Sequence, residues 1–122
     1  MIDDSPSMLE SIQMMLQSSG FDVAVFSRWS NAHQKLQAEG VDLIITDIYM
    51  PDADGLEVIR ARRSMCPHVP VVAMSGMSGT RDMLKVARLM GACLTLRKPF
   101  TKEQLLGAIS SALVGNLQQK VV

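Results

Sequence analysis

The segment Val41-Asp-Leu-Ile-Ile-Thr-Asp47-Ile-Tyr-Met-Pro51-Asp-Ala-Asp-Gly55 decides the fold. Its run Leu43–Thr46 is apolar and β-branched, which is typical of a strand buried on both faces. This strand ends at the carboxylate of Asp47, and the Pro51 and Gly55 that follow favour a turn. Because ligands bind at the carboxyl ends of strands in open α/β sheets, Asp47 is a candidate functional residue. An Asp at a strand end can also be a simple turn residue, so the rest of the chain must decide.

Length and composition indicate a single domain with its own hydrophobic core. The chain has 122 residues, 48% of them hydrophobic, which is enough for one core. Its 12 basic and 12 acidic residues cancel, so charge gives no support for a nucleic-acid or membrane binder. Ten acidic residues precede Val58 and ten basic residues follow it, so the two parts carry net charges of −8 and +8 unless folding interleaves them.

The chain shows no targeting pattern at its start and no apolar run long enough to cross a bilayer. Cys66 and Cys93 are widely separated, and we expect both thiols to be reduced and mostly buried. These features predict a cytoplasmic protein.

Apolar periodicity and turn residues predict five alternating strands and helices. The predicted strands are Met1–Ile2, Phe21–Phe26, Leu43–Thr46, Val69–Met74 and Cys93–Leu96. The predicted helices run from Pro6 to Gly20, from Ser30 or Asn31 to near Gly40, from about Gly55 to Ser64, from Thr80 to about Met90, and from Thr101 to about Val114 or beyond. Such alternation predicts a parallel sheet with helices on both faces.

Polar side chains follow four of the five predicted strands. They are Asp3, Asp4, Asp47, Ser75 and Lys98. Carboxylates held close together repel each other, and a hard cation such as Mg²⁺ relieves that repulsion. A carboxylate can attack phosphorus, while a metal ion and a lysine neutralise the transferred group. The set therefore predicts phosphoryl transfer to an aspartate.

These residues, together with Met50-Pro51, Asp54-Gly55 and Pro99-Phe100, make the chain resemble a receiver domain of two-component response regulators over almost its whole length. The resemblance implies a three-layer flavodoxin-like (βα)5 fold with a parallel sheet of order 2-1-3-4-5. The domain would occupy residues 1–122, with a core of about 1–114 and a C-terminal tail of 115–122.

The resemblance also implies the roles of the site residues. Asp47 would accept a phosphoryl group from the phosphohistidine of a sensor histidine kinase or a phosphotransfer protein. Mg²⁺ would be bound directly by Asp4, Asp47 and the backbone carbonyl of Tyr49, and through a water molecule by Asp3.

Ser75 and Lys98 would bind the phosphoryl oxygens, and the Lys98–Pro99 peptide bond is expected to be cis. The domain would catalyse only its own phosphorylation and dephosphorylation, and would not turn over external substrates.

The sequence departs from the family pattern at three places. Only Met1-Ile2 precede the acidic pair, so the first strand is truncated and we expect Met1 to lie inside a strand that begins further upstream. Thr95 stands where the family often has an aromatic switch residue. Tyr49, two residues after Asp47, lies beside the path of the hydrolytic water, and we hypothesise that its bulk slows loss of phosphate. Met77 is a further candidate modulating residue.

Basic residues gather near the predicted output face. Arg81, Lys85 and Arg88 recur at helical spacing, and Arg97 and Lys102 flank the adjacent strand and helix. By resemblance, the face formed by the fourth helix, fifth strand and fifth helix meets an output partner or a second copy of the chain. The charge favours an acidic partner, although a solvated helix face also explains the stripe.

Four alternative functions can also be compared with the sequence, and the residues argue against three of them. A haloacid dehalogenase-type phosphatase needs a second Asp where this chain has Tyr49. A histidine phosphotransfer site at His33 would need an all-helical bundle, whereas predicted strands flank this helix. A nucleotide-binding fold is disfavoured, because no glycine-rich phosphate-binding motif follows the first predicted strand. A receiver-like module that binds partners without being phosphorylated remains the main alternative.

Overall fold

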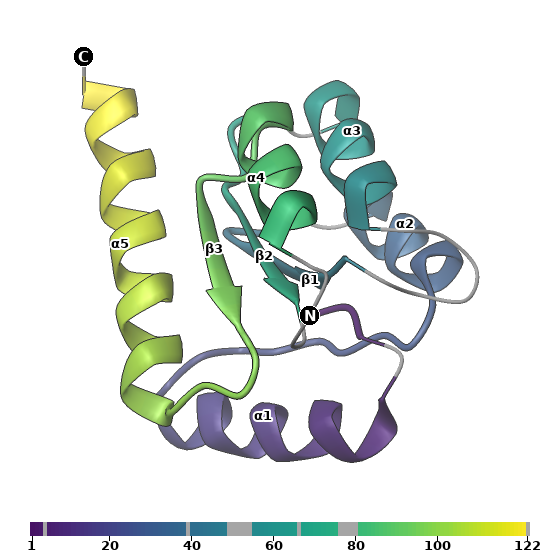
Figure 1. Ribbon diagram of the computed structural model, residues 1–122, viewed down its shortest axis with the longest axis vertical. Coiled ribbons are helices and arrows are strands. Elements are labelled where there is room, and N and C mark those ends of the chain that lie inside the picture. Colours follow the sequence, from purple (N-terminus) through teal and green to yellow (C-terminus); the bar gives the residue numbers. More distant parts are fainter. Residues whose placement is uncertain (4, 39, 49–54, 66, 76–80, 122) are drawn as a thin grey trace.

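The computed structural model describes residues 1–3, 5–38, 40–48, 55–65, 67–75 and 81–121. From Trp29 onward, helices and strands alternate along these residues (Figure 1). In chain order they are α1 (Pro6–Ser18), α2 (Trp29–Ala38), β1 (Ile44–Asp47), α3 (Gly55–Met65), β2 (Val71–Ser75), α4 (Arg81–Met90), β3 (Leu94–Arg97) and α5 (Lys102–Val121). The predicted alternation is confirmed from α2 onward, where the bounds shift by at most two residues except at the end of α5; the first two predicted strands are only isolated bridges.

The sheet is parallel, with the order β1-β2-β3. Ile44 lies opposite Val71, and Val72 lies opposite Leu94. Ile2 forms parallel bridges with Phe26 on one side and with Thr46 on the other. The order across the sheet is therefore the segment ending at Phe26, the N-terminal segment, β1, β2 and β3. This is the 2-1-3-4-5 order of the flavodoxin-like fold.

The prediction of a strand over Phe21–Phe26 is wrong for most of its length. Phe26 alone forms a bridge, and residues 21–25 have no regular secondary structure. The reason is the short first strand, in which a single residue, Ile2, is bridged. A strand needs a partner to share its ladder of hydrogen bonds, and Met1–Asp3 supplies a partner only near Phe26. The first two predicted strands are thus each reduced to a bridged residue, Ile2 and Phe26.

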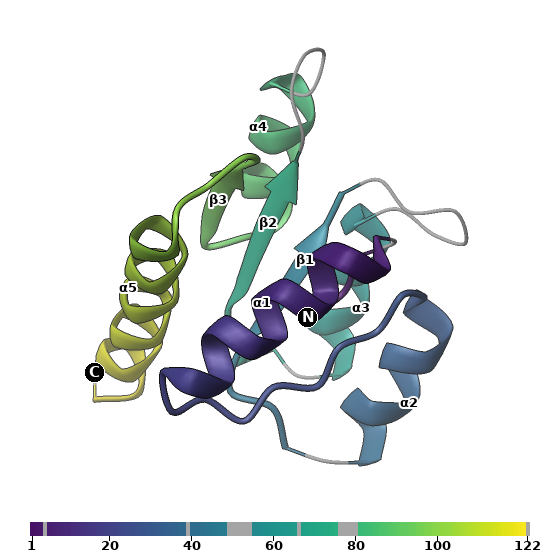
Figure 2. The ribbon, with the colours of Figure 1, turned by 90° about the horizontal axis from the view of Figure 1, so that it is seen from below.

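Two layers of helices cover the sheet (Figure 2). Helices α1 and α5 pack on one face and helices α2, α3 and α4 on the other. Along β2, Val72 and Met74 face the first layer, while Val71 and Ala73 face the second, as the alternation of a strand requires. All five residues of β2 are buried, so the prediction of strands buried on both faces is confirmed here.

The two buried clusters are the core. Between the sheet and α1/α5 it comprises Ile12, Leu16, Ile45, Val72, Met74, Leu105, Ile109 and Ala112. On the other face it comprises Ile2, Trp29, Ala32, Ile44, Ile48, Val58, Ile59, Val71, Ala73, Ala87 and Ala92. Full burial of one such large side chain stabilises the fold by about 1.5–3 kcal/mol.

Local signals end and begin the helices where the sequence suggested. After α1, the Gly20 N–H donates to the Gln17 carbonyl and the Phe21 N–H to the Leu16 carbonyl, which is a Schellman motif with Gly20 at φ +93°. At the start of α5, the Thr101 and Gln104 side chains each accept a hydrogen bond from the other residue's backbone N–H, at 3.1 and 2.9 Å.

One expectation about the thiols is wrong. Cys93 is exposed, because it lies in the turn just before β3 rather than inside the strand; its thiol still donates to the Val71 carbonyl at 3.4 Å. Cys66 lies outside the described residues. None of the described helices is long and apolar enough to span a membrane.

Candidate functional site

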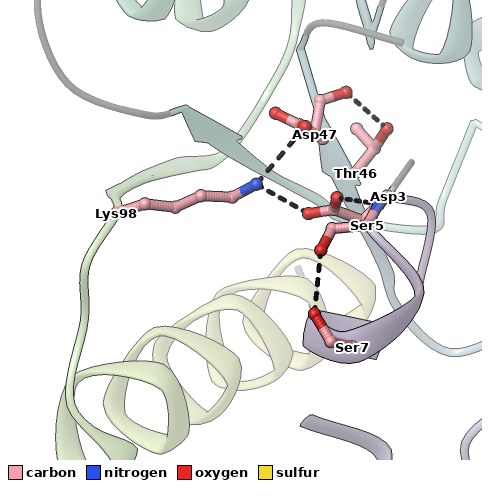
Figure 3. Close-up of polar contacts among 6 residues, drawn as sticks. All are labelled: Asp3, Ser5, Ser7, Thr46, Asp47 and Lys98. Carbon is pink, nitrogen blue, oxygen red and sulfur yellow. Dashed lines mark hydrogen bonds and ion pairs between the residues drawn. The ribbon is translucent and has the colours of Figure 1, made fainter. Parts of the chain in front are cut away.

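The carboxyl ends of the parallel strands bring the predicted site residues to one edge of the sheet. Strand β1 ends at Asp47, β2 ends at Ser75, and Lys98 follows β3. Asp3 follows the bridged Ile2 and joins them at the same edge. Figure 3 shows Asp3, Asp47 and Lys98 pointing toward one another from three different segments.

Lys98 connects the two carboxylates. Its Nζ lies 2.7 Å from Oδ2 of Asp3 and 3.3 Å from Oδ2 of Asp47. The Asp3 side chain is fully buried, and the Lys98 side chain is 19% exposed. Burial by itself lowers the pKa of Lys98, but the hydrogen bond that Lys98 donates to Asp3 and the negative charges of Asp47 and Asp3 outweigh it, so the pKa is raised. Lys98 is therefore a cation at neutral pH, beside both carboxylates.

Backbone pairing holds the two acidic residues side by side. The Ile2 N–H donates to the Ile45 carbonyl, and the Asp47 N–H donates to the Ile2 carbonyl, each at 2.8 Å. The Ser5 N–H donates to Oδ1 of Asp3 at 3.0 Å, which fixes the orientation of that carboxylate. Sequence reasoning missed this contact. An Asp side chain often accepts a hydrogen bond from the N–H of the second residue after it, which is an Asx-turn. The position of Asp3 just before a helix could have predicted this contact.

The neighbouring strand ends are tied to the site by two more hydrogen bonds. Thr46 is buried, and its Oγ1 donates to the Asp47 carbonyl at 3.0 Å (Figure 3). The Lys98 N–H donates to the Ser75 carbonyl at 2.7 Å. The Lys98–Pro99 peptide bond that follows is cis, as the resemblance implied. The lysine is thus anchored to the end of β2 through its backbone while its side chain reaches β1.

Ser75 is fully buried, and its Oγ has no hydrogen-bond partner among the described residues. A buried hydroxyl without a partner costs free energy, so native proteins keep few of them. Such a hydroxyl is available to donate to an oxygen atom that enters the site from outside the protein.

The donor set fits Mg²⁺. This ion is usually bound by one or two carboxylates together with water and phosphate oxygens, and Asp3 and Asp47 supply two carboxylates that converge on one point. Within the described ranges no group of three or more His, Cys, Asp or Glu side chains could hold a metal. The two further predicted ligands, Asp4 and Tyr49, lie outside those ranges.

The other described residues considered from the sequence do not join the group formed by Asp3, Asp47 and Lys98. Thr95 is half-buried on β3, opposite Ala73 of β2. Met77 lies outside the described residues. His33 packs edge-on against Trp29 with ring centroids 5.3 Å apart, which is a packing role. His68 is exposed in the turn between α3 and β2.

The predicted basic residues are partly described. Lys85, Arg88, Arg97 and Lys102 are exposed, on α4, β3 and α5. Arg81 is the first residue of α4, and its side chain lies outside the described part of the molecule.

Comparison with known proteins finds one family. The family model described as the response regulator receiver domain matches residues 1–110 of this sequence. The chain is 33% identical over 119 residues to the response regulator protein TodT of Pseudomonas putida, covering 98% of this chain and 52% of TodT. It is 30% identical over 112 residues to the transcriptional regulatory protein FixJ of Bradyrhizobium diazoefficiens, covering 92% of this chain and 54% of FixJ. The chain thus spans about half the length of these curated relatives.

A solved structure supports the same conclusion. The crystal structure of a response regulator receiver domain protein from Clostridium thermocellum superimposes with a TM-score of 0.88 at 29% identity, covering 99% of this chain and 95% of that one. Receiver domains of response regulators interact with histidine kinases and output domains. From its sequence match, its strand order and its fold, this chain belongs to the response regulator receiver domains of two-component systems.

Proposed function

We propose that the chain is a phosphoacceptor that takes a phosphoryl group onto Asp47 from the phosphohistidine of a histidine kinase or phosphotransfer protein. The observation that carries the proposal is the position of Lys98, whose Nζ lies 3.3 Å from Oδ2 of Asp47. An ammonium group at this distance can form an ion pair with the carboxylate before transfer and with a phosphoryl oxygen on that carboxylate afterwards.

In the proposed reaction, a carboxylate oxygen of Asp47 attacks the phosphorus atom. The phosphorus–nitrogen bond of the donor breaks, its electron pair returns to the imidazole, and Asp47 becomes an acyl phosphate. Lys98 and the Ser75 hydroxyl bind the transferred oxygens. Mg²⁺, held by Asp3, Asp4, Asp47 and the Tyr49 carbonyl, would supply charge neutralisation. Water then hydrolyses the acyl phosphate, so the domain catalyses only its own phosphorylation and dephosphorylation.

The proposed readout begins at Ser75. Its carbonyl accepts the Lys98 N–H, so a shift of Ser75 toward a phosphoryl group acts on the segment between β3 and α5. Thr95, on the neighbouring strand, would take the place of the usual aromatic switch, and Met77 would modulate the site. Tyr49 would slow hydrolysis by restricting water, so Tyr49→Asn should shorten the lifetime of the phosphorylated state. An unchanged dephosphorylation rate would contradict this role.

The proposed output surface is the basic face formed by Lys85, Arg88, Arg97 and Lys102, on α4, β3 and α5. Its charge suits an acidic partner, and self-association through the same face is the other outcome. Charge reversal by Arg88→Glu should weaken partner binding and its salt dependence, whereas Arg60→Glu on α3 is the matched control. Equal effects of the two substitutions would exclude an electrostatic output face.

We also propose that residues 1–114 form the core and that residues 115–122 are a tail. The protein would act in the cytoplasm without binding nucleic acid or membranes directly. Selective cross-linking to DNA, or pelleting with vesicles, would contradict the partner assignment.

The decisive experiment is incubation with acetyl phosphate and Mg²⁺ followed by intact-mass measurement. The wild type should gain the mass of one phosphoryl group, and Asp47→Ala should not. Chelation of Mg²⁺ should abolish the gain in the wild type. The alternative, a receiver-like interaction module that is never phosphorylated, predicts no Asp47-dependent mass increase.

A further inference from the structure

A cavity of about 260 Å³ lies at the amino-terminal edge of the sheet, where β2 and β3 begin. Its walls are residues 67–70, which lead into β2, and the turn that leads into β3. Helix α3 contributes Arg62, and α5 contributes Ser111 and Ala112. The candidate phosphorylation site lies at the opposite edge, toward which the arrowheads of β2 and β3 point in Figure 1, so the cavity is separate from it.

Arg62 places a positive charge in the wall of this cavity. Its Nη1 donates to the Pro67 carbonyl and its Nη2 to the Gly91 carbonyl, each at 2.9 Å. Both acceptors are neutral, and Nε is buried without a hydrogen-bond partner among the described residues. A guanidinium group has five N–H donors, so the two carbonyls satisfy it incompletely. An anion would supply both the missing acceptor and the missing countercharge.

No negative charge opposes Arg62 in this wall. None of the described residues that line the cavity is acidic. Partial burial raises the pKa of the Cys93 thiol, and the positive charge of Arg62 offsets only a part of this effect, so the thiol is neutral at pH 7. The Ser111 hydroxyl is also neutral, and His68 can add only positive charge. The described wall is therefore cationic.

The remaining lining is mainly apolar, from Val69, Pro70, Leu94 and Ala112. The volume lies below the range of about 300–1,000 Å³ that is typical of pockets for drug-sized ligands, so the ligand must be small. A phosphate ion has polar oxygens on every side and would turn some of them toward the apolar wall. A short carboxylic acid has one charged end and one apolar end, which matches the division of the lining.

We propose that this cavity is a binding site for a small organic carboxylate, which pairs with the Arg62 guanidinium and packs its apolar body against Val69 and Leu94. Arginine suits this role because its planar fork of donors matches the two oxygens of a carboxylate. A bound ligand would join α3 and α5 to the turns that lead into β2 and β3, and would therefore stabilise the folded state by mass action.

The test titrates the unphosphorylated chain, without Mg²⁺, with sodium isovalerate and records amide chemical shifts by NMR. The Gly91, Cys93 and Ser111 amides should shift in a saturable way. At about ten times the dissociation constant, Tm should rise by about 5 °C. Isovaleramide has the same apolar body without the charge and should bind about tenfold more weakly. Asp47→Ala should bind isovalerate as the wild type does, so the result does not depend on the proposed phosphorylation.

Two kinds of variant locate the ligand. Arg62→Met should lower the affinity for isovalerate about tenfold, to that for isovaleramide. This substitution also removes two hydrogen bonds that hold the turns, so a second variant leaves Arg62 in place. Ser111→Trp, at an exposed position in the lining, should block the cavity and abolish binding. Ser110→Trp, exposed on α5 but not part of the lining, is the matched control.

Several results would overturn the proposal. Equal affinities for isovalerate and isovaleramide would mean that the cavity does not recognise the charge. Equal binding by the Ser111→Trp and Ser110→Trp variants would place the ligand elsewhere. Shifts centred on Lys98 would assign the carboxylate to the phosphorylation site, and the absence of saturable shifts in the millimolar range would exclude a binding site.

Discussion

Lys98 Nζ lies 2.7 Å from Oδ2 of Asp3, although 95 residues separate them in the sequence. The pair joins the acidic N-terminal part of the chain to the basic C-terminal part, so at this point folding interleaves the two charge excesses. Because the Asp3 side chain is fully buried, the ammonium group is its main compensation for lost water.

Removal of this ammonium should therefore destabilise the fold. Lys98→Met keeps most of the apolar stem and leaves the buried Asp3 without its cation. We expect a loss on the order of 2 kcal/mol in the free energy of unfolding, below the range for a fully buried pair because Lys98 is partly exposed. Urea denaturation measures it. Lys102→Met, at an exposed position on α5, is the control, and an equal effect of both substitutions would contradict the prediction.

The same pair predicts a pH dependence at the alkaline side. The pKa of Lys98 is raised above its usual 10.5 by its acidic neighbours, so the folded state holds the proton more tightly than the unfolded state. The resulting stabilisation is complete below pH 10.5 and is lost as the pH rises through the folded-state pKa. The stability difference between wild type and Lys98→Met should be constant near neutral pH and shrink in alkali. A difference that grows with pH would have the wrong sign.

Two buried hydroxyls at adjacent strand ends should respond in opposite ways. Thr46 Oγ1 has a partner, the Asp47 carbonyl, whereas Ser75 Oγ has none among the described residues. Thr46→Val should cost about 1 kcal/mol of unfolding free energy. Ser75→Ala should leave stability unchanged or raise it slightly, yet slow phosphorylation by acetyl phosphate. If Ser75→Ala were as destabilising as Thr46→Val, the Ser75 hydroxyl would have a structural partner.

Substitution of alanine at two glycines should change the stability of the fold in opposite directions. Gly91 has φ +129°, and an added Cβ would lie 2.7 Å from Nη2 of Arg62, which donates to the Gly91 carbonyl. Gly91→Ala should therefore destabilise the fold by about 1–3 kcal/mol. Gly107 lies inside α5 with open space around its Cβ position, so Gly107→Ala should stabilise by up to about 1 kcal/mol. Thermal unfolding of both variants checks the prediction, and a change of the same sign in both would contradict it.

Local sequence signals predicted most of the fold. The apolar run before Asp47, the glycines after α1 and α4, and the capping box before α5 act within a few residues, so each could be read without knowledge of distant contacts. The strand over residues 21–26 was predicted wrongly for the opposite reason. Its alternating pattern is local, but pairing depends on the N-terminal segment, which reaches only as far as Phe26.

The sequence by itself determined which chemical groups stand at the carboxyl end of each strand: Asp3, Asp47, Ser75 and Lys98. Only the tertiary structure decided how they meet. Parallel pairing places Asp3 beside Asp47, the Ser75 carbonyl anchors the Lys98 backbone, and burial leaves the Ser75 hydroxyl without a partner among the described residues. Such contacts join residues tens of positions apart, and their distances depend on strand register and helix packing, which no local pattern encodes.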